Sequence, residues 1–333
     1  MDIIQSQQAF FNHIKSLLPA HLSMVDEIAE LLGISNDSAY RRIRGDKPIG
    51  LDEIQKLCRH YKLSLDQLLQ LNSDTVIFSA QLDDERAYNF NIYLKGILGK
   101  LQLIHSLPQC EFYCFNKDIP MFYFMQFPVL SAFKFFCWKR TLMNYPDLLK
   151  QQFSGIEPDT EVMETGKKII ETYVKIPSTE ILNEEMVLVT LKQIKFYREA
   201  NLFENNEVLA KVYNELEQLI NHLEVQAEKG IKFIVNENPN ALSAQNNIYI
   251  NETLLGTNNI YVKSGERQLT IINHSGINFM TTQDQHFCDY IYNDLRSIIR
   301  KSTHISVTGE KERNIIFSSL RYMIKEWKGN IAN

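Results

Sequence analysis

The sequence predicts an α+β protein with an all-helical N-terminal domain and a larger domain of helices and strands. The chain has 333 residues, more than the roughly 100–200 residues of a typical domain. Apolar residues recur at helical spacing through residues 1–72, whereas β-rich segments occur only later, in 110–127 and 231–280. Residues 73–86 lack clear periodicity and end in an acidic run. We therefore expect a helical domain at 1–72, a linker at 73–86 and an α+β domain at 87–333.

Composition excludes several classes of protein. Hydrophobic residues make up 44% and charged residues 23% of the chain, as in globular proteins, which excludes wholesale disorder. The net charge of −5 excludes a chain that is basic throughout, so nucleic-acid binding would need a local basic cluster. The five cysteines, an odd number, fit free thiols in a reducing cytoplasm. The most apolar window, Phe122–Trp138, is shorter than the about 20 residues of a membrane-spanning helix.

Start and stop signals divide the N-terminal domain into short helices. Ser23 is placed to cap one helix at its start, and Gly33 is placed to end it. Ser35 caps the next helix, which Gly45 ends. The capping-box pattern of Ser64–Gln67 opens a further short helix. The domain therefore consists of helices joined by tight turns.

This order of helix, glycine turn, helix, basic loop and helix resembles the helix-turn-helix of the phage repressor and Cro type, also called XRE-like. Ala29 is small where two helices cross closely, Gly33 makes the turn, and Ile34 is buried beside it. The resemblance covers about 50 of the 333 residues and implies a recognition helix that enters the DNA major groove. The matching positions are Ile28-Ala29, Leu32-Gly33-Ile34-Ser35, Gly45, Pro48, Leu63-Ser64-Leu65-Asp66 and Leu68-Leu69.

Two positions depart from the pattern of that family. Val25 stands where the family commonly has a glutamine that holds a phosphate, so that contact must come from elsewhere or is missing. Arg42 stands three residues before Gly45, where the family usually has a buried aliphatic residue. Ile43 follows Ala39 at i+4 and fits one buried face instead. We therefore expect a slightly rotated recognition helix and carry over no base assignments.

The recognition helix and the loop after it supply the expected DNA contacts. Residues near the start of this helix face base edges, where asparagine pairs with adenine and arginine with guanine. The segment 41–62 holds seven lysines and arginines against three acids, a local charge of +4 that leaves −9 for the rest of the chain. The expected base-reading residues are Asn36, Asp37, Ser38, Tyr40 and Arg41. The expected phosphate contacts are Arg42, Arg44 and Lys47.

The domain at 87–333 is expected to hold antiparallel strands in 110–127 and 231–280, separated by a helical insertion. Within the insertion, 184–230 has the pattern of a helical hairpin that ends at Gly230. Two sets of strands that flank helices would suit a GAF- or PAS-like sensory domain, although no motif supports this assignment. The expected role of the domain is dimerisation, effector sensing, or both.

Two apolar stripes in this domain are candidate dimer seams. One recognition helix reads only a few base pairs, so regulators of this kind place two heads about 34 Å apart on a pseudo-palindromic site. We therefore expect a homodimer, with the stripe beside the linker favoured as its seam. The alternative is that both stripes pack inside the domain. The first stripe consists of Phe90, Leu94, Ile97 and Leu101, and the second runs from Leu209 to Leu223.

Signatures of enzymes and cofactor sites are weak or missing. No two glycines are separated by one residue, and no G-x-S-x-G motif occurs, so the dinucleotide fingerprint and the hydrolase elbow are excluded. Asp284, His286 and Cys288 do not share one helical face and suit a metal ion poorly. Cys110 and Cys114 leave a redox switch open, and the aromatic residues of 113–127 leave a ligand cavity open. We expect no enzyme, no metal and no cofactor.

The sequence thus predicts a cytoplasmic, one-component transcriptional regulator that binds double-stranded DNA as a homodimer. A small-molecule or protein effector is left open. One alternative is an interaction or scaffold protein whose helical domain binds another protein. The other is an enzyme in the C-terminal domain with a DNA-binding appendage. Steep salt dependence of DNA binding separates the first reading from the second. Perturbed titratable groups converging in a cleft would favour the third.

Overall fold

The chain folds into two units, Met1–Ile77 and Phe78–Asn333, here named the head and the body. The expected linker at 73–86 contains strand β1 (Ser79–Ala80), which pairs with a strand of the body, so part of that segment belongs to the body sheet. The computed structural model describes residues 3–18, 22–61, 63, 65, 75–80, 89–183, 185–252, 258–275 and 277–329. The capping box expected at Ser64–Gln67 lies largely outside the described residues.

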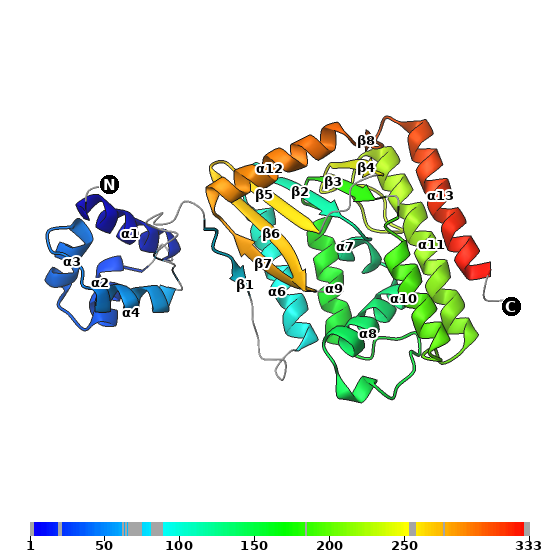
Figure 1. The fold of residues 1–333 in the computed structure, drawn as a ribbon, viewed down its shortest axis with the longest axis horizontal. Coiled ribbons are helices and arrows are strands. Elements are labelled where there is room, and N and C mark those ends of the chain that lie inside the picture. Colours follow the sequence, from blue (N-terminus) through cyan, green and yellow to red (C-terminus); the bar gives the residue numbers. More distant parts are fainter. Residues whose placement is uncertain are drawn as a thin grey trace. The chain divides into compact units, whose positions relative to one another are not determined.

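Short helices around one small apolar core form the head (Figure 1). Gly33 and Gly45 end two of these helices with φ of 68° and 85°, the left-handed conformation that glycine adopts without strain. Ser23 occupies an N-cap position without a side-chain hydrogen bond, whereas Ser35 Oγ accepts the N–H of Ser38. Among its described residues, the helices are α1 (Ile3–Leu17), α2 (Met24–Leu32), α3 (Asn36–Arg44) and α4 (Leu51–Tyr61). The core residues are Phe10, Phe11, Ile14, Ile28, Ala29, Leu32, Ala39 and Leu57.

An eight-stranded mixed sheet, in the order β1-β7-β6-β5-β2-β3-β4-β8, is the centre of the body. The pairs β2–β3 and β3–β4 are parallel, and all the other pairs are antiparallel. The expected α+β class is therefore confirmed, while the expectation of antiparallel strands alone was wrong. After β1, the strands are β2 (Glu111–Asn116), β3 (Ser178–Asn183), β4 (Asn246–Asn251), β5 (Asn259–Ser264), β6 (Arg267–Ser275), β7 (Asn278–Thr282) and β8 (Thr303–His304).

Helices cover both faces of this sheet and bury two different cores (Figure 1). Along β2, Phe112 and Cys114 point into the larger core, whereas Tyr113 and Phe115 pack toward α12, as the alternation of a strand requires. The helices are α6 (Phe90–Ser106), α7 (Met121–Phe124), α8 (Pro128–Cys137), α9 (Thr160–Tyr173), α10 (Leu188–Glu199), α11 (Asn206–Lys229), α12 (Gln285–Arg300) and α13 (Glu310–Gly329), with a π-helical turn η2 (Trp138–Leu142) and a 3-10 turn η3 (Pro146–Leu148).

The strand expectations for the body need three corrections. The aromatic run after Pro120 forms the short helix α7, because a continuous apolar run fits a fully buried helix as well as a strand. Residues 231–236 form no strand and contribute only a bridge between Ile231 and Gln245. Strand β3 went unpredicted because its buried face includes polar Ser178 and Glu180, which interrupt the apolar pattern of a buried strand.

Both candidate dimer seams pack inside the body. Phe90, Leu94 and Leu101 are each at most 3% exposed, and their stripe on α6 faces the larger core. The stripe from Leu209 to Leu223 on α11 is buried in the same core. The helical hairpin itself is confirmed as α10 and α11, and Gly230 ends it with φ of 66°. No helix among the described residues combines the length and the apolar character needed to cross a membrane.

Candidate nucleic-acid interface

Helix α3 presents one exposed face and one buried face. Asp37, Tyr40, Arg41 and Arg44 are exposed, and their spacing of i, i+3, i+4 and i+7 places them in one stripe. Ala39, on the other side of the helix, is completely buried in the head core. The resemblance of the sequence assigns α3 as the recognition helix, and this exposed stripe is the surface it offers to a groove.

Arg42 lies inside the head. The residue is 6% exposed, and it forms a two-pronged ion pair in which Nε donates to Glu53 Oε2 at 2.9 Å and Nη2 to Oε1 at 2.7 Å. Its Nη1 donates to the carbonyl oxygen and the hydroxyl of Ser38, at 3.1 and 3.0 Å. This placement corrects the expectation of a phosphate contact for Arg42, because the guanidinium is buried and all three of its nitrogen atoms donate to Glu53 or Ser38 within the head. The buried position three residues before Gly45 is thus kept and filled by an arginine.

Glu53 makes this burial possible. The Arg42 guanidinium beside it holds the pKa of the Glu53 carboxyl below its usual range. Glu53 Oε2 also accepts the backbone N–H of Gly50 at 3.0 Å, and this bond satisfies an orphan donor where α4 begins. The carboxylate therefore fixes α3 to the start of α4 and supplies the negative charge that a buried guanidinium needs.

Two neighbouring glutamines of α1 hold the loop after the recognition helix. Gln7, which is 9% exposed, donates through Nε2 to the carbonyl oxygens of Arg42 and Lys47 at 2.7 and 2.8 Å. Its Oε1 accepts the N–H of Ile49 at 3.1 Å. Gln8 donates to the carbonyl of Arg44 at 2.9 Å from an exposed position. These hydrogen bonds fix the backbone of the loop that carries Lys47.

Two of the expected phosphate contacts remain exposed, Arg44 at the end of the α3 stripe and Lys47 in the loop after it. The Arg44 guanidinium lies over the Tyr40 ring at 5.6 Å from its centre and is 3.6 Å from the Asp46 carboxylate. Lys47 is exposed, and no ion pair of its side chain occurs among the described residues. Both side chains have the charge and the accessibility that a phosphate contact requires.

The expected base-reading residues separate into two groups. Asp37, Tyr40 and Arg41 are exposed on the α3 stripe, and Arg41 has no ion-pair partner in the described part of the chain. Asn36 is exposed but donates to Asp26 Oδ1 at 2.8 Å, so pairing with a base would require it to exchange this partner. Ser38 is only partly exposed, and its hydroxyl serves Arg42.

Gln7 and Glu53 are the contributors that the sequence did not reveal. Gln7 lies outside the motif, on a helix that the family resemblance does not cover. Glu53 has a sequence signal, because it stands three residues after Gly50 at the start of a helix, as in the return half of a capping box. A buried arginine needs a carboxylate partner, but Arg42 was expected on the surface as a phosphate contact.

Comparison with known proteins supports a DNA-binding head. Residues 9–85 match the model of the BetR domain, a helix-turn-helix-like DNA-binding domain. No curated protein matches the chain. The chain is similar to the solved structure described as "Structure of TrmBL2, an archaeal chromatin protein, shows a novel mode of DNA binding", with 9% identity over 88% of this chain and 98% of that chain and a TM-score of 0.23. A TM-score of 0.23 does not indicate a shared fold. The family match indicates a DNA-binding domain of the helix-turn-helix kind, and the XRE type in particular stays a prediction.

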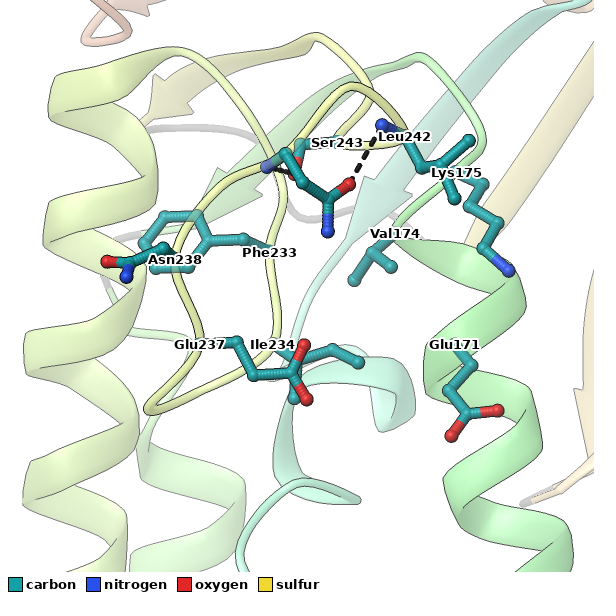
Figure 2. Close-up of a pocket in the computed structure, with 10 residues that line it drawn as sticks. Glu171, Val174, Lys175, Phe233, Ile234, Glu237, Asn238, Leu242 and Ser243 are labelled. Carbon is teal, nitrogen blue, oxygen red and sulfur yellow. Dashed lines mark hydrogen bonds between the residues drawn. The ribbon is translucent and has the colours of Figure 1, made fainter.

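The body contains a pocket of about 210 Å³ beside the end of α9, lined by charged and apolar side chains together (Figure 2). Figure 2 shows Glu171 and Lys175 on one side and Glu237 across from them on the loop that follows α11. Asn240 braces this loop, since its Oδ1 accepts the N–H of Leu242 at 2.8 Å. The charged groups of the pocket have both signs and do not select one class of ligand.

The sequence also left open a ligand cavity lined by aromatic residues and a redox pair of cysteines. The structure shows ordinary packing at both places. The aromatic set of 113–127 lies mostly in the cores, because Phe115, Phe122 and Phe127 are at most 6% exposed. Cys114 is buried on β2, and Cys110 precedes that strand. The described residues contain no group of three or more histidine, cysteine or acidic side chains that could hold a metal ion.

Proposed function

We propose that this protein is a sequence-specific transcriptional regulator that acts in the cytoplasm as a homodimer. The observation that carries the proposal is the exposed stripe of Asp37, Tyr40, Arg41 and Arg44 on α3, with Lys47 in the loop behind it. This stripe belongs to a head that matches a DNA-binding family. We assign the body to dimerisation and effector sensing and not to catalysis.

The contacts divide into two classes with different signatures. Arg44 and Lys47 contact phosphates, so each contributes to affinity on every sequence and to its salt dependence. Arg41 and Asn36 read base edges, so they determine which sequence is preferred. Arg42 contributes only through the stability of the head.

Fluorescence anisotropy with duplex DNA at several salt concentrations tests the phosphate contacts. Arg44→Ala and Lys47→Ala should each weaken binding on all sequences and reduce the salt slope by about one unit. Lys311→Ala, which removes an exposed lysine of the body, is the matched control and should change neither quantity. Affinity that is independent of salt and of these side chains would instead support a head that binds another protein.

Selection of bound sites from a random DNA library tests the base contacts. The wild-type protein should enrich one pseudo-palindromic motif, and Arg41→Ala should relax the preference at one position by about 1–3 kcal/mol. Equal loss of affinity on every sequence would assign Arg41 to the phosphate class.

A further inference from the structure

An apolar groove opens in the body between the π-helical turn η2 and α10. Its volume is about 440 Å³, within the range of roughly 300–1,000 Å³ for small-molecule sites. Trp138, Leu142, Val189 and Phe196 form its apolar wall. Phe196 is 61% and Leu142 is 45% exposed, so the described chain leaves this apolar surface uncovered. A π-helical turn is rare and occurs frequently at functional sites.

The hydroxyl groups that line the groove are hydrogen-bonded to each other. These are the hydroxyl groups of Thr141 and Tyr197, whose oxygen atoms lie 2.9 Å apart. Burial raises the pKa of the Cys137 thiol to about 12, so this side chain is neutral at physiological pH. The groups that remain for a ligand are therefore those of Lys192 and Gln193, which follow each other on α10.

A buried lysine fixes the orientation of the Gln193 amide. Lys134, which is 3% exposed, donates through Nζ to Gln193 Oε1 at 2.7 Å and to Thr190 Oγ1 at 3.3 Å. Both acceptors are neutral. Burial lowers the pKa of Lys134, and the charge of the Asp118 carboxylate partly offsets this effect without forming an ion pair among the described residues. An ammonium group only donates hydrogen bonds, so it holds the amide oxygen of Gln193. The NH₂ of that amide is left without a partner in the described part of the chain.

The charge of the groove has one sign. Lys192 is exposed and forms no ion pair with any described residue. None of the described residues that line the groove is an aspartate or a glutamate. The groove therefore combines an aromatic and aliphatic wall with the N–H donors of Gln193 and the cationic Lys192.

We propose that this groove binds a small amphipathic monoanion, a carboxylate with an aliphatic or aromatic tail. The tail packs against Trp138 and Phe196, and the carboxylate accepts hydrogen bonds from Gln193 Nε2 and Lys192 Nζ. Such charge-assisted bonds are stronger than neutral ones. A cationic amphiphile of the same length would place its charge beside Lys192 and be repelled. The site goes beyond DNA binding and does not depend on it.

Tryptophan fluorescence of the full chain tests the site directly. The protein has two tryptophans, so Trp327→Phe leaves Trp138, in the wall of the groove, as the single reporter. Decanoate is expected to give a saturable change in emission, with at least about tenfold higher affinity than decylammonium. The absence of saturation with decanoate would overturn the site. Equal affinity for both amphiphiles would overturn the assignment of an anionic ligand.

Two substitutions in the same reporter background locate the ligand. Lys192→Gln should weaken decanoate about three- to fivefold, while the matched variant Lys195→Gln, on the same helix outside the lining, should leave the affinity unchanged. Val189→Phe should fill the groove and abolish binding, with thermal unfolding as the check that the body stays folded. Equal effects of the two lysine variants would place the ligand elsewhere and overturn the proposal. These readouts involve no DNA, so they stand or fall separately from the function of the head.

Discussion

A single carboxylate decides whether Arg42 is tolerated inside the head. Glu53→Gln keeps the shape of the side chain but removes the charge that compensates the guanidinium, so a buried cation loses its counter-ion. We expect the head to lose about 2 kcal/mol of unfolding free energy. Urea unfolding of the ¹⁵N-labelled full chain, followed by NMR through the amide signals of α3, measures this loss. Glu30→Gln, at an exposed position of α2, is the control.

The same pair gives the head a defined response to acid. The pKa of Glu53 is lower in the folded state than its ordinary value of 4.5, so the pair contributes its full stability above that value. This contribution is lost as the pH falls through the folded pKa, because protonation removes the ion pair. The wild-type head should therefore lose more stability below pH of about 4.5 than the Glu53→Gln head. Parallel acid profiles of the two proteins would contradict the assigned role.

Two glycines with similar backbone angles should respond differently to substitution. Gly309 has φ of 73°, and a Cβ there would collide with the backbone carbonyl of His304. Gly265 has φ of 58° in the β5–β6 turn, and nothing lies within 4 Å of a Cβ at that position. We expect Gly265→Ala to cost about 1 kcal/mol from the backbone angle alone. Gly309→Ala should cost about 2–4 kcal/mol, because overpacking adds to the strain. Urea unfolding measured by tryptophan fluorescence tests both values, and equal costs would contradict the close approach.

At the level of elements, α1 acts as a brace for the DNA-facing loop. Gln7→Ala removes three hydrogen bonds to the backbone of residues 42–49 and leaves partly buried groups unsatisfied. The head should lose about 2 kcal/mol, as read from the α3 amide signals in urea. Gln8→Ala removes one exposed bond and should cost less than about 0.5 kcal/mol. If Gln7→Ala and Gln8→Ala reduce the unfolding free energy of the head equally, the buried hydrogen bonds of Gln7 are not what braces the loop.

Elements with conventional caps and one apolar face were predictable from the sequence, and elements with mixed faces were not. Helices α2 and α3 end at Gly33 and Gly45 as their sequence predicts, and α11 ends at Gly230. Strand β3 was not found, because its Glu180 is completely buried and accepts hydrogen bonds from Tyr123 at 2.8 Å and Ser178 at 2.9 Å. A polar group satisfied by partners distant in sequence leaves no local pattern that marks its burial.

For the whole molecule, the head was more predictable than the body because its information is local. The turn, the caps and the basic cluster of the head fall within one short segment. The parallel pairing of β2, β3 and β4 depends on crossovers through α7–α9 and through α10 and α11, which no local pattern reports. The placement of Arg42 also depends on Glu53, eleven positions away. One candidate phosphate contact therefore changed its role, while Arg44 and Lys47 kept an exposed position.

The two apolar stripes are buried inside the body, so they leave the dimer interface unassigned. The outward face of α6 is a specific candidate surface for that interface. Ile92 and Leu103 are 59% and 63% exposed, and Gly96 and Gly99 lie between them at a 4-3-4 spacing, so the four share one face. Glycine within a helix costs roughly 0.5–1 kcal/mol relative to alanine. No described atom beyond the adjoining backbone lies within 4 Å of a Cβ at either glycine, so the packing of the body gives no reason for these residues. Close approach of α6 from a second copy would give one.

We therefore expect the full chain to be a dimer at micromolar concentration and Ile92→Lys to be a monomer, because a charge on this face cannot be buried unpaired. Sedimentation equilibrium measures both states. Ile315→Lys, on α13 at 58% exposure, introduces the same charge elsewhere and should stay dimeric. The Ile92→Lys monomer should also bind a pseudo-palindromic site more weakly than the wild-type dimer, while retaining affinity for a half-site, since only the pairing of two heads is lost. A monomeric wild type, or a dimer that Ile315→Lys disrupts and Ile92→Lys does not, would show that α6 is not the seam.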